Sequence, residues 1–235
     1  MKRFFFLFFL FSQAFAIQDS IVLFEDGFKS SAGVWSIRSH RQKSPSVIIW
    51  FHGGMQSPNC QKGLIAGKGL FELLNDSNII VASPSACQNN HWLSPSLTSI
   101  TDKLLDSLER HFNFSIKEVH LAGVSDGTLG VLAYSINGKR KVLSRLLISS
   151  NLSMLGDSQK ISQIKKVKTG KWLFLQGGRD RLYPASHVLP WLYSFCESIG
   201  SSCDIVFDPE GEHDWSYWVQ KHPNQIRQFR FSKLP

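Results

Sequence analysis

The sequence predicts a single α/β domain in which a mostly parallel central sheet is flanked by helices. Six short runs are continuously apolar and rich in β-branched or aromatic residues, which is typical of parallel strands buried on both faces. They are Val47–Phe51, Ile79–Ala82, Val119–Ala122, Leu143–Ile148, Trp172–Leu175 and Ile205–Phe207. Helical patterns alternate with these runs over short connections, and this alternation indicates a doubly wound sheet.

The remaining elements are assigned from their periodicity. Alternating residues at Ile21–Phe24 and Val34–Arg38 favour a half-exposed hairpin before the first buried strand. Four segments have apolar residues at helical spacing: Leu97–Phe112 with Ser96 as N-cap, Leu129–Ile136, Val188–Ile199 with Pro190 in its first turn, and Trp215–Phe231 with an interruption at Pro223. Only about twenty residues separate the strands near Ser150 and Lys171. A large cap domain does not fit there.

The N-terminus has the three parts of a secretory signal peptide. Lys2 and Arg3 give a positive start, an apolar run spans Phe4–Phe11, and Ala14-Phe15-Ala16 is a small-x-small cleavage pattern. We expect residues 1–16 to be removed, which leaves a catalytic domain over 17–235. The apolar run is shorter than the roughly 20 residues that span a bilayer. The sequence therefore predicts a secreted or periplasmic protein without stable membrane insertion, with an uncleaved anchor as the alternative.

Composition limits the partners of the mature chain. The 235 residues are 43% hydrophobic and 19% charged, which excludes a disordered chain. Lys2 and Arg3 are the only charged residues in the expected signal peptide, so its removal lowers the net charge from +8 to +6. Basic residues are scattered, except for a cluster at Lys165, Lys166, Lys168 and Lys171. We interpret that cluster as a solvated face and expect no nucleic-acid partner.

Four cysteines form an even set, which in an exported protein permits disulfides. Cys196 and Cys203 flank a Gly-Ser turn, and Cys60 and Cys87 each follow a predicted buried strand. Three connectivities remain open from the sequence. No C-x-x-C pair with a histidine set occurs, so we expect neither a zinc site nor another metal.

The candidate nucleophile is Ser125, in the run Gly123-Val124-Ser125-Asp126-Gly127. This run lies between the strand at Val119–Ala122 and the helix at Leu129–Ile136. A serine at such a junction needs a sharp turn to project its oxygen above the sheet, and glycines on either side remove side chains that would clash. The alternative is an ordinary glycine-rich turn between a strand and a helix.

A serine hydroxyl becomes nucleophilic when a base takes its proton, so a histidine is expected downstream. His213 follows the last predicted strand, where a loop can bring its imidazole over Ser125. His120, His187 and His222 are interpreted as structural or surface residues.

An acid must hold the tautomer of that base, and Asp180 follows the strand at Trp172–Leu175. The resulting chain order of serine, aspartate and histidine is typical of this kind of fold. Asp157 is the rival acid, while Asp208 and Asp214 are nearer to His213 in sequence. The structural alternative for Asp180 is a turn residue that pairs with Arg179 or Arg181.

Negative charge that develops on a substrate oxygen needs preorganised donors. We expect one to be the backbone N–H of Asp126. The other is expected from the glycine loop after the strand at Val47–Phe51, where Gly54 or Met55 would supply it. His52 is interpreted as the residue that orders this loop.

These motifs together resemble the α/β-hydrolase superfamily, and within it the group of putative esterases that includes feruloyl esterases, esterase D-like enzymes and polyhydroxybutyrate depolymerase-like proteins. The matching pieces lie at 52–56, 123–127, 178–180 and 213–218. The resemblance implies an α/β-hydrolase fold with Ser125, Asp180 and His213 as catalytic residues and backbone donors at Gly54, Met55 and Asp126. Thr128 departs from the pattern, because many relatives carry a further glycine there.

The activity that the resemblance implies is hydrolysis of carboxylic esters through an acyl-enzyme, without a cofactor. The substrate would be a small-molecule or polymer-linked ester. Trp92, Tyr183 and Trp215 are candidate substrate contacts, although Trp215 and Trp218 are better explained as core contacts of the last helix. A peptidase or thioesterase with the same three residues, or a hydrolase-like binding protein without turnover, is the alternative.

Overall fold

A computed structural model describes residues 16–25, 28–37, 45–54, 57–88 and 90–230. Its eight strands form one sheet in the order β1-β2-β4-β3-β5-β6-β7-β8. Apart from Ala16, which begins β1, the expected signal peptide lies outside the described residues. The strands are β1 (Ala16–Glu25), β2 (Phe28–Ile37), β3 (Ser46–Phe51), β4 (Ile79–Ser83), β5 (Glu118–Val124), β6 (Lys141–Ile148), β7 (Lys171–Gly177) and β8 (Cys203–Asp208).

All six predicted buried runs are strands, and they pair in parallel. The predicted hairpin is confirmed, because β1 and β2 pair antiparallel and β2 joins the sheet antiparallel to β4. One expectation about burial is wrong. Strand β8 lies at the edge of the sheet, so its residues are exposed or only partly buried rather than covered on both faces.

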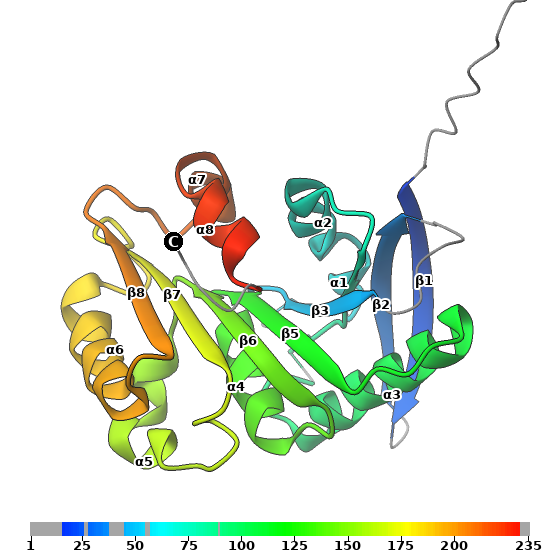
Figure 1. The fold of residues 1–235 in the computed structure, drawn as a ribbon, viewed down its shortest axis with the longest axis horizontal. Helices are drawn as coiled ribbons and strands as arrows, with labels where there is room; N and C mark the ends of the chain where they lie inside the picture. Colours follow the sequence, from blue (N-terminus) through cyan, green and yellow to red (C-terminus); the bar gives the residue numbers. More distant parts are fainter. Residues whose placement is uncertain (1–15, 26–27, 38–44, 55–56, 89, 231–235) are drawn as a thin grey trace, which may run out of the picture.

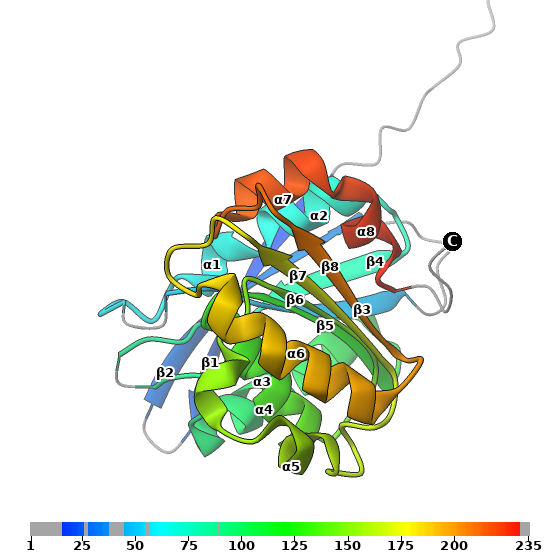
Figure 2. The ribbon, with the colours of Figure 1, turned by 90° about the vertical axis from the view of Figure 1, so that its left-hand side faces the viewer.

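Helices cover both faces of the sheet (Figures 1 and 2). Helices α3, α4, α5 and α6 lie on one face, where their apolar side chains form the larger of two hydrophobic cores. Helices α2, α7 and α8 lie on the other face over the smaller core. The elements are α1 (Gly63–Ala66), α2 (Lys68–Leu74), α3 (Pro95–Phe112), α4 (Gly127–Asn137), the 3-10 helix η1 (Leu152–Leu155), α5 (Ser158–Ser162), α6 (Ala185–Ile199), α7 (Trp215–Lys221) and α8 (Pro223–Gln228).

Two details of the predicted helices are corrected. Helix α3 begins at Pro95 with Ser94 as its N-cap, and the Ser96 hydroxyl instead donates a hydrogen bond to Asn90 Oδ1 at 2.6 Å. Helix α6 begins at Ala185, earlier than expected, so Pro190 lies in its second turn and removes one interior backbone hydrogen bond. The predicted break at Pro223 is confirmed, since α7 ends at Lys221 and α8 begins at Pro223.

No large cap covers the sheet between β6 and β7, where the chain forms only η1 and α5. Two disulfides, Cys60–Cys87 and Cys196–Cys203, resolve the connectivity that the sequence left open. The first ties together the loops that follow β3 and β4, and the second closes the turn between α6 and β8. Within the described part of the chain, no helix is both long and apolar enough to cross a bilayer.

Asp208, at the end of β8, connects the sheet to helix α7. Its carboxylate accepts a hydrogen bond from the Tyr217 hydroxyl at 2.7 Å, lies 2.8 Å from Nε2 of His222 and accepts the Glu210 N–H at 2.9 Å. The hydrogen bonds from His222 and Tyr217 lower the pKa of Asp208 to about 2. This group therefore fixes the loop from 209 to 214, which carries His213.

Acid should weaken this connection before it protonates Asp208 fully. A carboxyl whose pKa is lower in the folded than in the unfolded chain stabilises the fold above the unfolded value near 3.9, and the gain disappears as pH falls toward 2. We expect Asp208→Asn to reduce the free energy of unfolding by about 1 kcal/mol at pH 6, a size that allows for screening of the pair by solvent. At pH 2.5 the reduction should be much smaller, because most of the stabilisation from the lowered pKa of Asp208 is already lost there.

Urea unfolding at the two pH values measures this difference. Asp204→Asn, which removes another carboxylate from β8, controls for the loss of one negative charge. An equal loss of stability at both pH values in Asp208→Asn would contradict the linkage.

Candidate active site

Ser125 occupies a sharp turn between β5 and α4. Its φ is +55°, in the left-handed region that side chains rarely adopt, and its N–H donates to the Ile148 carbonyl at 2.9 Å. A Cβ at Gly123 would lie 2.6 Å from the Gly127 carbonyl oxygen, and one at Gly127 would collide with the Phe51 carbonyl oxygen. Both glycines are therefore required sterically, and the turn holds Ser125 at the carboxyl end of the sheet.

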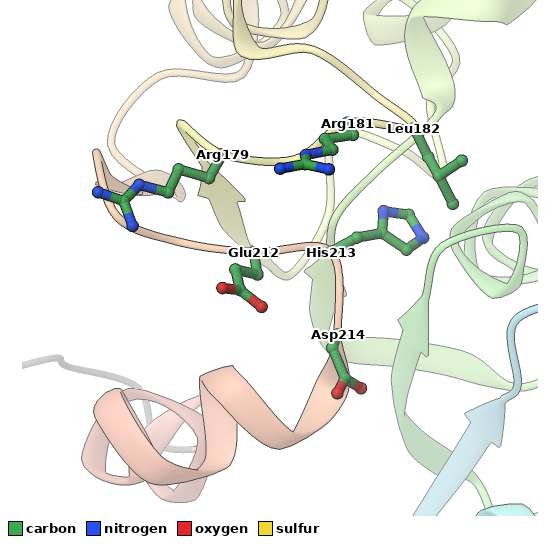
Figure 3. A pocket seen from close by; sticks show the side chains of 6 residues that line it. All are labelled: Arg179, Arg181, Leu182, Glu212, His213 and Asp214. Carbon is green, nitrogen blue, oxygen red and sulfur yellow. The ribbon is translucent and has the colours of Figure 1, made fainter.

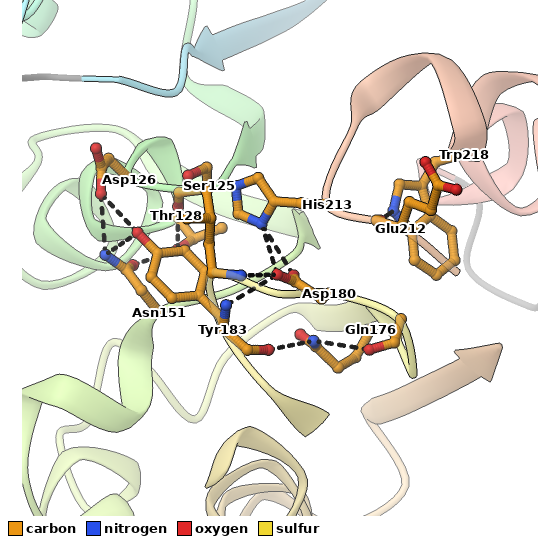
Figure 4. A network of polar contacts seen from close by, with 12 residues as sticks. Ser125, Asp126, Thr128, Asn151, Gln176, Asp180, Tyr183, Glu212, His213 and Trp218 are labelled. Carbon is orange, nitrogen blue, oxygen red and sulfur yellow. Dashed lines mark hydrogen bonds and ion pairs between the residues drawn. The ribbon is translucent and has the colours of Figure 1, made fainter. Parts of the chain in front are cut away.

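His213 and Asp180 form a hydrogen-bonded pair beside this turn (Figure 4). Nδ1 of His213 lies 3.0 and 2.9 Å from the two carboxylate oxygens of Asp180. The Asp180 side chain is 0% exposed and that of His213 is 23% exposed. A carboxylate acceptor requires the proton on Nδ1, which leaves Nε2 as the basic nitrogen, on the side of the ring that faces Ser125 in Figure 4.

The Asp180 carboxylate is held in its charged form. Burial acts to raise its pKa, but hydrogen bonds from His213 and from the backbone of Tyr183 and Leu182 outweigh burial, so the pKa lies below its ordinary value. The N–H groups of Leu182 and Tyr183 donate to Oδ1 at 3.0 and 2.8 Å. The turn after β7 therefore fixes the orientation of the carboxylate as well as its charge.

The rival carboxylates have other partners. Asp157 and Asp214 cap the N-termini of α5 and α7, and Asp208 binds Tyr217 and His222. The expected alternative for Asp180, a turn residue paired with a neighbouring arginine, is not what the structure contains: Arg179 pairs with Glu210 instead. Of the four aspartates considered, only Asp180 contacts the imidazole of His213.

The glycine loop after β3 lies directly against the serine. A Cβ at Gly53 would stand 3.1 Å from Cβ of Ser125, and Gly54 has a φ of +66°. Met55, the other expected donor, lies outside the described residues. His52 is buried, and its Nε2 accepts the Ala86 N–H at 3.0 Å. Burial lowers the pKa of His52 to about 4, so a neutral imidazole orders this loop, as expected.

A polar network surrounds Asp126, the residue after the serine (Figure 4). Its Oδ1 accepts hydrogen bonds from the Tyr183 hydroxyl at 2.9 Å and from Asn151 Nδ2 at 3.2 Å. The Thr128 hydroxyl lies 2.7 Å from the Ser125 carbonyl oxygen and 3.0 Å from Oδ1 of Asn151. Sequence reasoning missed Asn151 because it belongs to a loop distant in the chain. Thr128, noted only as a departure from the family pattern, ties this loop to the turn.

Tyr183 contacts three parts of the site. Besides its hydroxyl bond to Asp126, its N–H donates to Asp180, and its ring meets the His213 imidazole edge-on at 5.1 Å between centroids. Burial is the main cause that raises the pKa of Tyr183, so the hydroxyl keeps its proton and donates. This position favours a role within the site frame, although Tyr183 was expected from sequence as a substrate contact.

The two tryptophans expected near a substrate are placed differently. Trp92 is 1% exposed, its indole N–H donates to the His52 carbonyl at 3.0 Å, and its ring packs edge-on against Phe51. The expectation that Trp92 binds substrate is therefore wrong, because the side chain is part of the core below the loop. Trp215 is partly buried against Trp50, at 4.9 Å between ring centroids, which agrees with the packing alternative. Trp218 is fully buried.

An open cleft of about 430 Å³ adjoins His213 (Figure 3). Leu182 is the one aliphatic residue in its lining, and the other lining residues are polar or charged. The lining residues are Arg179, Arg181, Leu182, Glu212, His213 and Asp214. Among the described residues, no group of three or more histidine, cysteine or acidic side chains could hold a metal ion.

Comparison with known proteins identifies the fold. No protein-family model matches the chain, and no curated protein matches it. A ferulic acid esterase of known structure superposes with a TM-score of 0.70 at 16% identity, over 91% of this chain and 99% of the other. A thermostable esterase gives 0.66 at 12% identity over 89% of this chain, and the Pyrococcus horikoshii acylaminoacyl peptidase gives 0.61 at 11% over 90%.

The chain spans 61% of the length of the thermostable esterase and 39% of that of the peptidase. The superposition covers 89% to 91% of this chain, which is a mostly parallel eight-stranded sheet with helices on both faces and no large cap. The protein therefore has the α/β-hydrolase fold.

Proposed function

We propose that the protein is an exported serine hydrolase that cleaves carboxylic esters with Ser125 as nucleophile, His213 as base and Asp180 as acid. The hydrogen-bonded pair of His213 and buried Asp180 beside the Ser125 turn is the observation that carries this proposal. An imidazole held in one tautomer by a charged carboxylate is what a serine needs to lose its proton. Similarity of fold to structures named as esterases supports the ester as substrate.

The reaction proceeds through an acyl-enzyme. As Oγ of Ser125 attacks the ester carbonyl carbon, Nε2 of His213 takes the hydroxyl proton and Asp180 stabilises the imidazolium. The tetrahedral intermediate collapses, and the leaving alcohol takes that proton from His213. Water then attacks the acyl group while His213 accepts its proton, and Ser125 leaves with that proton as the acid is released.

Backbone N–H groups would stabilise the negative oxygen of each tetrahedral intermediate. One belongs to Asp126, at the start of α4, where the helix dipole also favours negative charge. The other belongs to Gly54 or Met55 in the glycine loop. The contact between Gly53 and Ser125 supports this assignment, because it brings that loop to the serine.

Export rests on the N-terminal pattern of the sequence, and the two disulfides agree with an oxidising compartment. The substrate enters from an open face, since no large cap lies above the sheet.

The second candidate is a peptidase with the same three residues, favoured by the fold similarity to the acylaminoacyl peptidase.

Replacement of the nucleophile tests the proposal directly. We expect Ser125→Ala to lower kcat for p-nitrophenyl esters by about 10⁴-fold or more, because the residual rate comes only from binding and the oxyanion donors. The assay compares kcat/KM for p-nitrophenyl esters, acyl-CoA thioesters and aminoacyl amides, with circular dichroism to confirm the fold of the variant. Wild-type turnover by Ser125→Ala would exclude this nucleophile, and a preference for amides would favour the peptidase.

Tyr183→Phe tests whether the hydroxyl positions the turn. This variant keeps the ring against His213 and the backbone bond to Asp180. It loses two bonds of the hydroxyl: the one that it donates to the Asp126 carboxylate, and a longer one, at 3.4 Å, that it accepts from Asn151 Nδ2. A hydrogen bond to a charged group contributes about 1.5–3 kcal/mol, so we expect kcat to fall about 10- to 100-fold with KM nearly unchanged.

The matched control is Tyr193→Phe, an exposed tyrosine on α6 at 54% exposure, which should keep the wild-type kcat. A rise in KM with an unchanged kcat in Tyr183→Phe would instead assign Tyr183 to substrate binding.

A further inference from the structure

A second cavity lies at the amino-terminal ends of the central strands, whereas Ser125 lies at their carboxyl ends. It has a volume of about 250 Å³ and lies between the end of α4, the start of β6 and the loop before β7. Because β5, β6 and β7 are parallel, the start of β6 is far from the carboxyl ends that carry the candidate active site. This cavity therefore has no part in the proposed hydrolysis.

The charge of its lining is of one sign. Five of its nine lining residues are basic and none is acidic; the basic ones are Lys139, Arg140, Lys141, Arg145 and Lys166. Arg140 is neutralised by Asp106 and Glu109, and Lys141 by Glu118. The other three form no ion pair with any carboxylate in the described part of the chain.

Arg145 is the central side chain of this set, because it is charged and only 1% exposed. Its guanidinium donates to the Ser135 hydroxyl at 2.7 Å and to the Thr169 and Lys166 carbonyls at 2.6 and 3.2 Å, and it lies 4.4 Å from the Trp172 ring centroid. All of these partners are uncharged. Desolvation accordingly lowers the pKa of Arg145 to about 9.

These bonds leave donors for a further acceptor. A guanidinium has five N–H groups, and three of those of Arg145 are used. Lys166 Nζ donates to the Gly138 carbonyl at 2.9 Å, which holds the ammonium at the cavity with two more N–H groups. A buried cation without a counter-charge costs free energy, which a bound anion would offset.

We propose that this cavity binds a small tetrahedral oxyanion, of the class of inorganic phosphate or sulfate. A volume of about 250 Å³ is below the roughly 300–1,000 Å³ of sites for drug-sized ligands, and four acceptor oxygens match the remaining donors of Arg145 and Lys166. The ion is free rather than a lipid headgroup. The partly exposed carboxylates of Asp106 and Glu118 lie near the cavity and would repel a broad anionic surface.

Isothermal titration of the mature protein with inorganic phosphate, at constant ionic strength maintained with chloride, tests the site. We expect saturable binding with one ion per chain, and a Kd raised at least about fivefold in Lys166→Ala and in Lys139→Ala. The matched control is Lys165→Ala, which removes the same charge one residue away from the lining and should keep the wild-type Kd. Ester hydrolysis without phosphate should be unchanged in all three variants.

Arg145→Met is a further variant, and loss of the central cation should abolish phosphate binding. If this buried substitution prevents folding, the Kd values of the lysine variants still test the site. Three results would overturn the proposal: no saturable heat with phosphate or sulfate, the same Kd in Lys165→Ala and Lys166→Ala, or co-sedimentation with phosphatidylglycerol vesicles in the absence of any response to free phosphate.

Discussion

The turn that holds Ser125 is the constraint on which the rest of the site depends. Its left-handed backbone is kept in place from three sides: a hydrogen bond from the Ser125 N–H to β6, the Phe51 carbonyl against Gly127, and the Gly127 carbonyl against Gly123. Strained backbone of this kind persists where the surroundings leave no alternative. Because the turn is packed between β3 and α4, the serine, the glycine loop and the start of α4 are positioned by one set of contacts.

The parallel sheet supplies the remaining groups at the same edge. Asp180 and His213 follow β7 and β8, and the Asp208 cluster anchors the loop that carries His213 to α7. Tyr183 and Asn151 then join the acid, the base and the residue after the serine into one hydrogen-bonded frame. The candidate site is thus built from loops that are each fixed to a strand end. No large cap covers it, because the chain between β6 and β7 forms only the short helices η1 and α5.

Some of this could be predicted from the sequence and some could not, for physical reasons. The strands from β3 to β7 are buried on both faces, so their apolar runs are unambiguous, and α3 has a long amphipathic face. Helices α1, α2 and α5 are too short to show a clear period. The sequence alone does not show that Trp92 faces the core, because an aromatic residue after a strand can face either way. Only its packing against Phe51 and His52 decides the direction. Asn151 belongs to none of the catalytic motifs, since its contact with the site forms only once the loop after β6 meets Asp126.

Labelling with a fluorophosphonate, followed by peptide mapping, measures most directly whether this turn presents an activated serine. A serine that His213 deprotonates attacks phosphorus, whereas an ordinary surface serine does not react. We expect a covalent adduct on Ser125 in the folded protein, its loss after thermal unfolding, and strongly slowed labelling in His213→Ala. Absence of an adduct, or an adduct on a different serine, would contradict it.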